Sequence, residues 1–241
     1  MTLSVVILAA GKGTRMFSEK PKVLHELSNQ PLLQYVINAA KNLKPININV
    51  VVGYKSKLIQ QEFSKEDINW VVQKEQLGTG DAVKCTTSFL EGSQTLILYG
   101  DVPLIKPETF RSLINHINED NVKSVVLTML LENPTGYGRI VKNQEGDFIK
   151  IVEEKDASPS IKAIHEINTG IMVLPSESLS KWLKSLKTKN AQGEYYLTDV
   201  IAMAVRDGVP IRTSQAKNEY EILGVNSRDQ LAALERQIQR Q

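Results

Sequence analysis

Apolar runs alternate along the first half of the chain with segments whose apolar positions recur at helical spacing. The run LSVVILAA at residues 3–10 is unbroken and rich in β-branched residues, which is typical of a strand buried on both faces. The next patterned segment, residues 31–43, begins at a proline and carries one apolar stripe. The stripe consists of Leu32, Leu33, Val36, Ile37 and Ala40. The pattern predicts a buried strand followed by an amphipathic helix.

Further strand-like runs follow in the first 132 residues, and a helical pattern at residues 81–90 lies between two of them. These runs cover residues 46–54, 68–73, 95–104 and 124–132. Parallel strands need a long crossover, usually a helix, between them. The alternation therefore predicts an α/β fold with a Rossmann-like, doubly wound, mostly parallel sheet.

The second half has a different pattern. Residues 138–156 suit a β-hairpin with NQEGD as its turn, and residues 166–175 suit a strand. Gly208 is placed to end a helix, and Ser227 with Gln230 is placed to form a capping box at the start of another. Helices are predicted at residues 178–186, 197–208 and 226–240. No repeat or Pro/Gly linker interrupts the chain, so we expect one domain with an inserted substrate-side half.

The composition is that of an ordinary soluble protein. The 241 residues are 41% apolar and 23% charged, and 29 basic residues nearly balance 27 acidic ones. No Lys/Arg run resembles a nucleic-acid-binding arm, and no apolar run reaches the roughly 20 residues of a membrane helix. We therefore expect neither nucleic acid nor a membrane as a partner. The first residues lack the basic region of a signal peptide, and the single cysteine, Cys85, suits a reducing cytoplasm.

A glycine loop follows the first strand, and two well-known glycine-loop designs do not fit it. A P-loop requires the spacing G-x-x-x-x-G-K-[S/T], whereas here the order is Gly11-Lys12-Gly13-Thr14. A dinucleotide fingerprint requires a third glycine at position 16, where this chain has Met16. Both designs are therefore excluded.

What remains is a loop of small residues with two cations downstream. The bare backbone of Ala9, Ala10, Gly11 and Gly13 can present N–H groups to an anion. Arg15 and Lys22 could then neutralise phosphate oxygens, the former as a planar fork and the latter as a point charge. A solvent-exposed turn is the alternative, but it would not explain the placement of Lys22 directly after a proline.

Spaced motifs along the whole chain resemble those of the sugar-1-phosphate nucleotidyltransferases. The signature LAAGKGTRM followed by PKVL is joined by QLGTG, YGDVPL, NPTGYGRI, IVEEKD, EINTG, NAQGEYYLTD and GVNSR, in that order. More narrowly, the chain resembles the uridylyltransferase domain of the bifunctional bacterial enzyme that makes UDP-N-acetylglucosamine. The resemblance implies a nucleotidyltransferase fold of the GT-A-like type and transfer of UMP from UTP to N-acetylglucosamine-1-phosphate. Both substrates are small molecules.

The resemblance also implies roles for individual residues. Arg15 and Lys22 are expected to be catalytic, and Asp101 and Asn226 to bind Mg²⁺. The residues expected at the nucleotide are Leu8, Ala9, Ala10, Gly11, Gln73, Gln76, Gly78 and Thr79. Those expected at the sugar are Tyr99, Gly138, Glu153 and Asn168. From the residues alone, Asp101 is well placed just past a buried strand, although a turn residue is an equal alternative.

The chain departs from the family pattern in two respects. Asp81 stands after QLGTG where the family commonly has histidine, which adds a negative charge beside the expected nucleotide site. The family enzyme also continues into a left-handed β-helix that transfers acetyl groups and forms trimers, whereas this sequence ends at Gln241. We expect residues 1–226 to form the uridylyltransferase domain and residues 227–241 to begin a linker. Acetyl transfer is then not expected, and we expect a monomer.

Two other functions stay open on the sequence alone. One is a nucleotidyltransferase that acts on another sugar-1-phosphate or on a polyol phosphate. The other is a catalytically silent nucleotide-binding protein of the same fold, against which the presence of Arg15, Lys22 and Asp101 argues.

Overall fold

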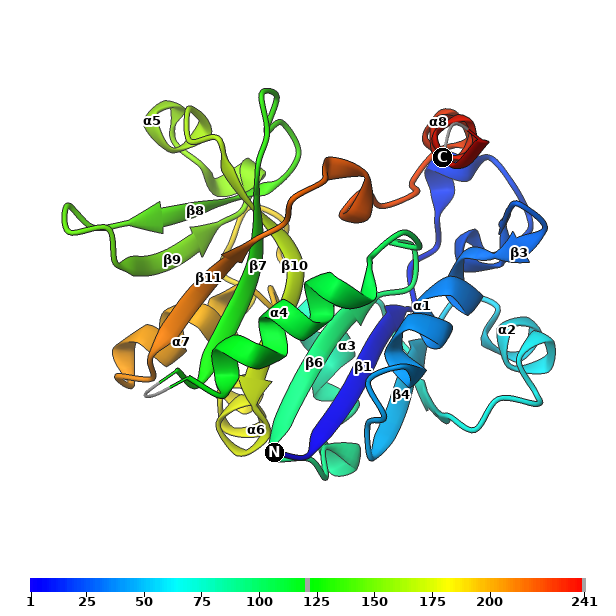
Figure 1. Ribbon diagram of the computed structural model, residues 1–241, viewed down its shortest axis with the longest axis horizontal. Helices are drawn as coiled ribbons and strands as arrows, with labels where there is room; N and C mark the ends of the chain where they lie inside the picture. The colour runs from blue at the N-terminus through cyan, green and yellow to red at the C-terminus, as the bar shows by residue number, and fades with distance from the viewer. Residues whose placement is uncertain (120–121, 240–241) are drawn as a thin grey trace.

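A mixed sheet forms the centre of the molecule (Figure 1). The computed structural model describes residues 1–119 and 122–239. Within these residues the main path of the sheet runs β11-β7-β10-β6-β1-β4-β5, and β8 and β9 extend it beside β10. The strands are β1 (Leu3–Ala9), β4 (Asn47–Val52), β5 (Asn69–Val72), β6 (Gln94–Tyr99), β7 (Ser124–Leu130), β8 (Gly138–Lys142), β9 (Phe148–Val152), β10 (Glu166–Pro175) and β11 (Ile211–Gln215). A separate two-stranded ribbon consists of β2 (Glu26–Leu27) and β3 (Gln30–Pro31).

Parallel pairing dominates the half of the sheet that contains the N-terminus. β1 pairs in parallel with both β4 and β6, and β4 pairs in parallel with β5. β10 runs antiparallel to β6 and β7, while the β8–β9 hairpin extends from β10. The prediction of a doubly wound, mostly parallel sheet with mixed strands is therefore confirmed.

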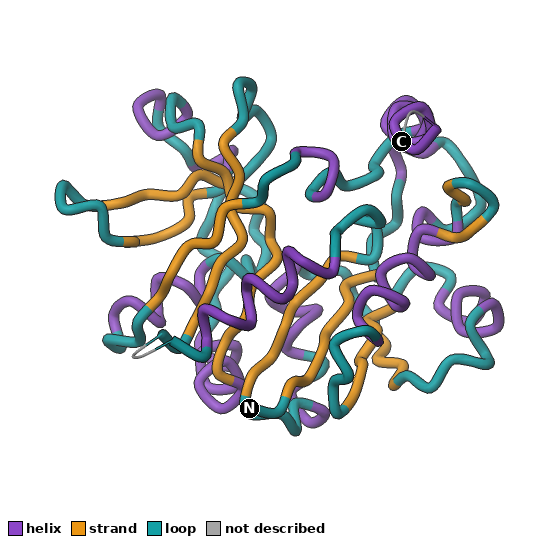
Figure 2. Tube along the Cα trace, viewed as in Figure 1, coloured by secondary structure: helices purple, strands orange, loops and turns teal. Residues whose placement is uncertain are grey.

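Helices cover both faces of this sheet (Figures 1 and 2). α1 (Leu32–Lys41), α2 (Ser56–Glu62) and α4 (Pro107–Ile117) pack on one face. α3 (Thr79–Lys84), α6 (Ser176–Ser185) and α7 (Asp199–Arg206) pack on the other. The short α5 (Pro159–Lys162) lies beside β8. None of the helices among residues 1–119 and 122–239 combines the length and apolarity needed to cross a membrane.

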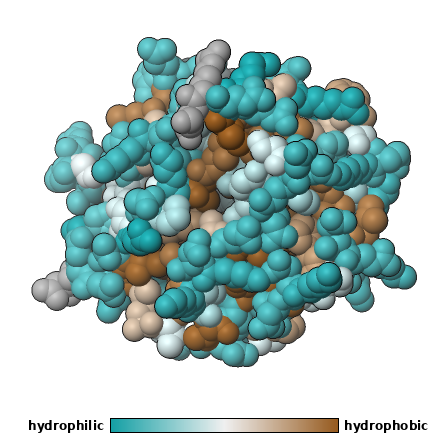
Figure 3. Space-filling view, turned by 45° about the vertical axis from the view of Figure 1, so that its right-hand side comes forward, coloured by the Kyte–Doolittle hydropathy of each residue, from teal (hydrophilic) through white to brown (hydrophobic). Residues whose placement is uncertain are grey.

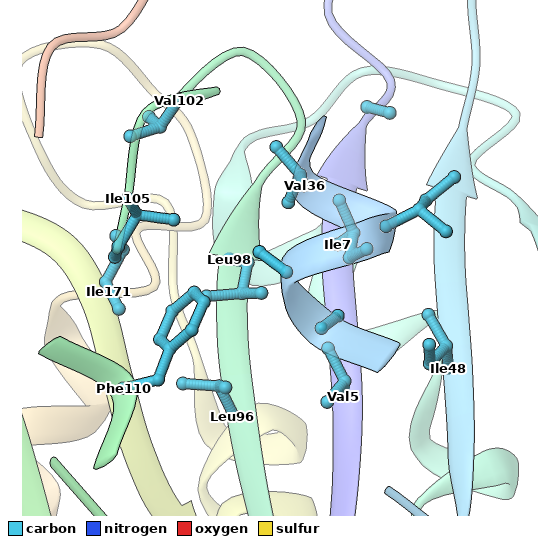
Figure 4. Packing of buried hydrophobic residues seen from close by; sticks show 14 of the residues in the cluster. Val5, Ile7, Val36, Ile48, Leu96, Leu98, Val102, Ile105, Phe110 and Ile171 are labelled. Atoms are coloured by element: carbon cyan, nitrogen blue, oxygen red, sulfur yellow. The ribbon is translucent and has the colours of Figure 1, made fainter. Parts of the chain in front are cut away.

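The central strands carry long apolar runs because each face of the sheet is covered. Val5 and Ile7 of β1 belong to the cluster under α1 and α4, whereas Val6 and Leu8 belong to the cluster under α3 and α6. Successive side chains of a strand point to opposite faces, so an unbroken apolar run is needed. Figure 4 shows the first cluster, in which Phe110 lies against the strands. Burying one such side chain contributes roughly 1.5–3 kcal/mol.

Most predicted elements are present with shifted ends, and two differ in a way that matters for the site. The run at residues 95–104 stops being a strand at Tyr99, so Asp101 lies in the turn beyond it. The helix predicted at residues 81–90 begins earlier, at Thr79, and gives way to a 3₁₀ turn at Thr87–Phe89. The elements that had no prediction include α2, α4, α5, β11 and the β2–β3 ribbon.

The last helix, α8 (Arg228–Gln239), begins at a cap that differs from the predicted capping box. Ser227 Oγ accepts from Gln230 N at 3.3 Å, as expected. Gln230 Oε1, however, accepts from Asn226 N at 2.7 Å rather than from Ser227 N. The helix lies beyond the carboxyl ends of β1 and β4 (Figure 1), and its Leu234 belongs to the same buried cluster as Met16, which follows the glycine loop. Residue 240 of the predicted helix lies outside the described residues.

Candidate active site

A cavity lies at the carboxyl ends of β1, β5 and β6, where ligands of open α/β sheets bind. It is lined by Leu8, Ala9, Ala10, Gly11, Lys22, Val23, Gln73, Gln76, Gly78, Thr79, Ala82, Tyr99, Asp101 and Glu194. All eight residues predicted to bind the nucleotide belong to this lining. A single concave surface thus unites motifs that lie far apart in the sequence, and we call it the first cavity.

The glycine loop places Lys22 at the edge of the first cavity. After β1 the chain forms two 3₁₀ turns, η1 (Thr14–Met16) and η2 (Lys22–Leu24), with Gly13 at φ +62° ahead of the first. A Cβ atom at position 13 would lie 2.6 Å from Lys22 Cβ. Gly13 therefore serves both a left-handed backbone turn and the close approach of the lysine stem.

Gly11 has a different role from Gly13. A Cβ atom at position 11 would meet nothing within 4 Å, so the fold itself does not require glycine there. Because Gly11 lines the first cavity, its missing side chain leaves the space open to a ligand. This is the feature expected of backbone that approaches a phosphate.

Lys22 bridges two side chains that come from distant segments. Its ammonium forms an ion pair with Asp101 Oδ2 and donates to Asn226 Oδ1 at 3.0 Å. The backbone holds Asn226 there, because Val225 N donates to Asp101 O at 2.8 Å. Asn226 Nδ2 donates to Gly224 O, which turns Oδ1 toward Lys22. A carboxylate and an amide oxygen thus converge on one positive charge.

The donor chemistry of this pair fits Mg²⁺. Asp101 and Asn226 supply two hard oxygen ligands, and their oxygens already share a cation in the Lys22 ammonium. Among the described residues, no group of three or more His, Cys, Asp or Glu side chains could hold a metal by itself. Two protein ligands suit a magnesium ion that takes its remaining ligands from phosphates and water.

A second cavity adjoins the first and contains Arg15. It is lined by Arg15, Lys22, Tyr99, Asp101, Val102, Thr135, Gly136, Tyr137, Thr169, Ile222, Gly224, Asn226 and Gln230. Lys22, Tyr99 and Asp101 line both cavities. The two predicted catalytic cations and the two predicted metal ligands therefore meet in one place. Arg15 is exposed within the η1 turn. The carbonyl groups at the end of this turn accept hydrogen bonds from Arg228 of α8.

The QLGTG loop (residues 76–80) is hydrogen-bonded to the QGEYY segment (residues 192–196), for which no contact was predicted. Tyr195 N donates to Leu77 O, and Gly80 N donates to Tyr195 O, both at 2.8 Å. A Cβ atom on Gly78, which has φ +116°, would lie 2.6 Å from Tyr195 O. The clamp formed by the QGEYY segment thus needs glycine at position 78. Glu194 of the same segment reaches the first cavity, a contribution that the sequence did not indicate.

Three of the four predicted sugar residues form a group beside the cavities. Asn168 of β10 is in register with Gly138 of β8, and a Cβ atom at Gly138 would lie 3.4 Å from Glu153 Oε2. These three line neither of the two cavities, and Glu153 instead lines a third one with Asp156, Thr198 and Asp199. Their assignment to the sugar stays a prediction.

Tyr99, the fourth, connects this group with the phosphate region. Its ring lies against Gly170, where an added Cβ would be 2.5 Å away. Burial raises the pKa of the Tyr99 phenol, and the charges of Glu153 and Asp101 raise it further. Burial also raises the pKa of the Glu153 carboxyl, and the hydrogen bond from Thr198 Oγ1 at 2.9 Å opposes that rise. Both side chains are thus held in a poorly hydrated environment.

One face of the molecule is mostly hydrophilic. Figure 3 shows a largely polar face on which hydrophobic residues gather in a hollow near the centre. Two cations lie beside an exposed backbone loop and two side-chain oxygens of a kind that suits Mg²⁺. This arrangement matches the needs of phosphoryl transfer, which relies on positioning and charge neutralisation. The fold and the site together define a nucleotidyltransferase.

The family comparison agrees with this class. The family model described as "MobA-like NTP transferase domain" matches residues 5–144, and the chain belongs to this family. The matched residues include the glycine loop, the QLGTG loop and the turn that carries Asp101.

Full-length similarity is found to proteins named bifunctional protein GlmU. The chain is 51% identical over 238 residues to that of Dechloromonas aromatica, which covers 98% of the chain and 52% of the relative. It is 50% identical over 240 residues to that of Pseudomonas aeruginosa strain PAO1 and 52% identical over 239 residues to that of Nitrosomonas europaea. The chain spans about half the length of these relatives.

Solved structures share the fold at much lower identity. A UDP-glucose pyrophosphorylase complexed with UDP-glucose superposes with a TM-score of 0.81 at 15% identity and covers 100% of this chain and 99% of its own. A putative glucose-1-phosphate thymidylyltransferase from Bacillus anthracis gives 0.76 at 18% identity, with 98% of this chain and 95% of its own covered. The predicted nucleotidyltransferase fold is confirmed.

Proposed function

We propose that this chain transfers UMP from UTP to N-acetylglucosamine-1-phosphate and so forms UDP-N-acetylglucosamine and pyrophosphate. The observation that carries the proposal is that Lys22, Tyr99 and Asp101 line both cavities. A nucleotide in the first cavity and a sugar phosphate beside the second would bring their phosphates together at these residues. The name of the half-identical relatives, bifunctional protein GlmU, supports the choice of this class of reaction.

The reaction needs little covalent help from the protein. An oxygen of the sugar phosphate attacks the α-phosphorus of UTP in line, a new P–O bond forms, and the bond to the bridging β-phosphate oxygen breaks. Pyrophosphate carries away the electron pair. No general base is required, since a phosphate monoester is already anionic near neutral pH.

The catalytic work then falls to the two cations. Lys22 would neutralise the transferring phosphate, because it stands where the two cavities meet. Arg15 would hold the departing β- and γ-phosphates through its planar fork. Asp101 and Asn226 would hold Mg²⁺, which when bound neutralises and orients phosphate oxygens. Holding the reactants in line can supply much of the rate enhancement.

The remaining assignments are the contacts to the nucleotide and to the sugar. Gln73, Gln76 and the Gly78–Thr79 backbone would contact the uridine, and the loop from Leu8 to Gly11 the remainder of the nucleotide. Tyr99, Gly138, Glu153 and Asn168 would contact the sugar.

A substrate panel tests this proposal. Pyrophosphate release is measured for UTP, CTP and dTTP, each with N-acetylglucosamine-1-phosphate, glucose-1-phosphate and a polyol phosphate. We expect the fastest release with UTP and N-acetylglucosamine-1-phosphate, and none without a divalent cation. Preference for another sugar phosphate would contradict the acceptor assignment. Absence of release with every pair would contradict catalysis itself.

A further inference from the structure

Asp81 is an acidic residue at the nucleotide site that none of these roles uses. It lies in the first turn of α3, where a carboxylate is also favoured by the free N–H groups of the helix. Its Oδ2 accepts a hydrogen bond of 2.8 Å from Gln73 Nε2. The same Nε2 donates to Gly78 O at 3.2 Å. Both hydrogens of the Gln73 amide are therefore used inside the protein.

These two bonds determine which way the Gln73 amide faces. An ionised carboxylate and a backbone carbonyl accept hydrogen bonds and cannot donate them. Turning the amide over would set its Oε1 against two oxygens, in a residue that is only 3% exposed. The orientation with Nε2 toward Asp81 and Gly78 is thus enforced, and Oε1 is left for the first cavity. Among residues 1–119 and 122–239, the hydrogen bonds of the Gln73 amide are the two that Nε2 donates, and Oε1 accepts none.

We propose that Asp81 is a positioning residue that makes Gln73 selective for uracil over cytosine. This inference rests on the proposed function, in which Gln73 faces the pyrimidine. Uracil carries a hydrogen on N3 that a fixed carbonyl oxygen can accept. Cytosine has a lone pair on N3, so the same oxygen would face another acceptor and lose its hydrogen bond. Asp81 itself does not line the cavity and acts through Gln73.

The chain offers a matched set of variants for the test. Asp81→Ala removes the acceptor and frees the amide to turn, so that Nε2 can donate to cytosine N3. Asp81→Asn keeps an oxygen that can accept from Gln73. Glu75→Ala removes an exposed carboxylate of the same loop that does not line the cavity. The affinities of each protein for UTP and CTP are measured by titration calorimetry, together with kcat/KM for both nucleotides.

We expect the preference for UTP to fall about tenfold in Asp81→Ala, the effect of one hydrogen bond. Most of the preference should return in Asp81→Asn, and Glu75→Ala should keep it unchanged. An equal loss of both affinities in Asp81→Ala would show a merely structural role and overturn the inference, as would a wild type that binds both nucleotides equally. A wild type that binds UTP preferentially but releases no pyrophosphate would instead overturn the proposed function.

Discussion

Lys22 and Asp101, 79 residues apart in the sequence, form an ion pair at the point where the two cavities meet. Both side chains are largely buried, with 14% and 12% of their surface exposed. A buried carboxylate that loses its partner is costly, so Lys22→Ala should lower the free energy of unfolding by about 2–3 kcal/mol. The matched variant Lys20→Ala, which breaks only the exposed pair with Glu26, should change it by less than about 1 kcal/mol.

The ion pair between Lys22 and Asp101 also predicts how Mg²⁺ affects the stability of the protein. In Lys22→Ala the oxygens of Asp101 and Asn226 face each other without the ammonium, and a divalent cation can take its place. Mg²⁺ should therefore raise the melting temperature of Lys22→Ala more than that of the wild type, in the absence of nucleotide. Equal shifts in the two proteins, measured by calorimetry with and without Mg²⁺, would contradict the assignment of these oxygens as metal ligands.

Gly11 and Gly13 should respond differently to alanine. Gly13→Ala places a side chain on a left-handed backbone, and its methyl group would clash with Lys22 Cβ. The variant should therefore lose about 2 kcal/mol of stability and displace the lysine. In Gly11→Ala the new methyl group has no neighbour within 4 Å, so the variant should be as stable as the wild type. Its KM for UTP should rise, because the methyl group enters the first cavity. Gly208→Ala is the control, because Gly208 has φ +68° and no atom within 4 Å of an added Cβ. This variant should lose stability and keep the KM of the wild type. Urea unfolding and steady-state kinetics distinguish the three variants.

Arg228 should support catalysis from outside the cavities. Its Nε and Nη2 donate to Met16 O and Phe17 O, both at 3.1 Å, and so brace the turn that carries Arg15. Arg228→Ala should lower kcat about tenfold, and Arg228→Lys should restore only part of it, because a lysine lacks the fork. Arg236→Ala, an exposed arginine on the same helix, should leave kcat unchanged. An unchanged kcat in Arg228→Ala would mean that the turn is held without α8.

The raised pKa of Glu153 predicts a stability difference that depends on pH. The native state favours the protonated carboxyl, so it loses stability as the pH rises from the ordinary value of 4.5 through the raised pKa. Glu153→Gln removes this penalty and should be more stable than the wild type at about pH 7, with the gain vanishing below 4.5. Its KM for the sugar phosphate should rise. A variant less stable than the wild type at about pH 7, in urea unfolding, would contradict the prediction. Glu132→Gln, at an exposed carboxylate, is the control.

Much of the fold could be predicted because the buried strands leave a clear pattern. β1 is apolar at every position but Ser4, and β4 ends in three consecutive valines, since both faces of the sheet are covered. β11 gave no such signal, because it is an edge strand in which only Ser214 is buried. α2 is short and buries only Ile59. α4 carries a signal in its sequence, because a proline lies in its first turn and Phe110 and Leu113 are one turn apart.

The candidate site could likewise be predicted only in part. The residues that follow strands β1, β5 and β6 could be placed together, because parallel strands end at one edge of the sheet. Asn226 could not be placed by pattern, since a single backbone bond from Val225 to Asp101 brings it there. The clamp at Tyr195 and the bond from Gln73 to Asp81 are likewise tertiary contacts that no local pattern records.

The most direct test of the account compares wild type and Lys22→Ala in the formation of UDP-N-acetylglucosamine from UTP and N-acetylglucosamine-1-phosphate at saturating Mg²⁺. Circular dichroism first establishes that the variant is folded at the assay temperature. The account predicts product with the wild type and a turnover at least about a hundredfold lower with Lys22→Ala, the loss typical of removing one group that stabilises transition-state charge. Near wild-type turnover in the folded variant would contradict the claim that phosphoryl transfer takes place at the junction of the two cavities.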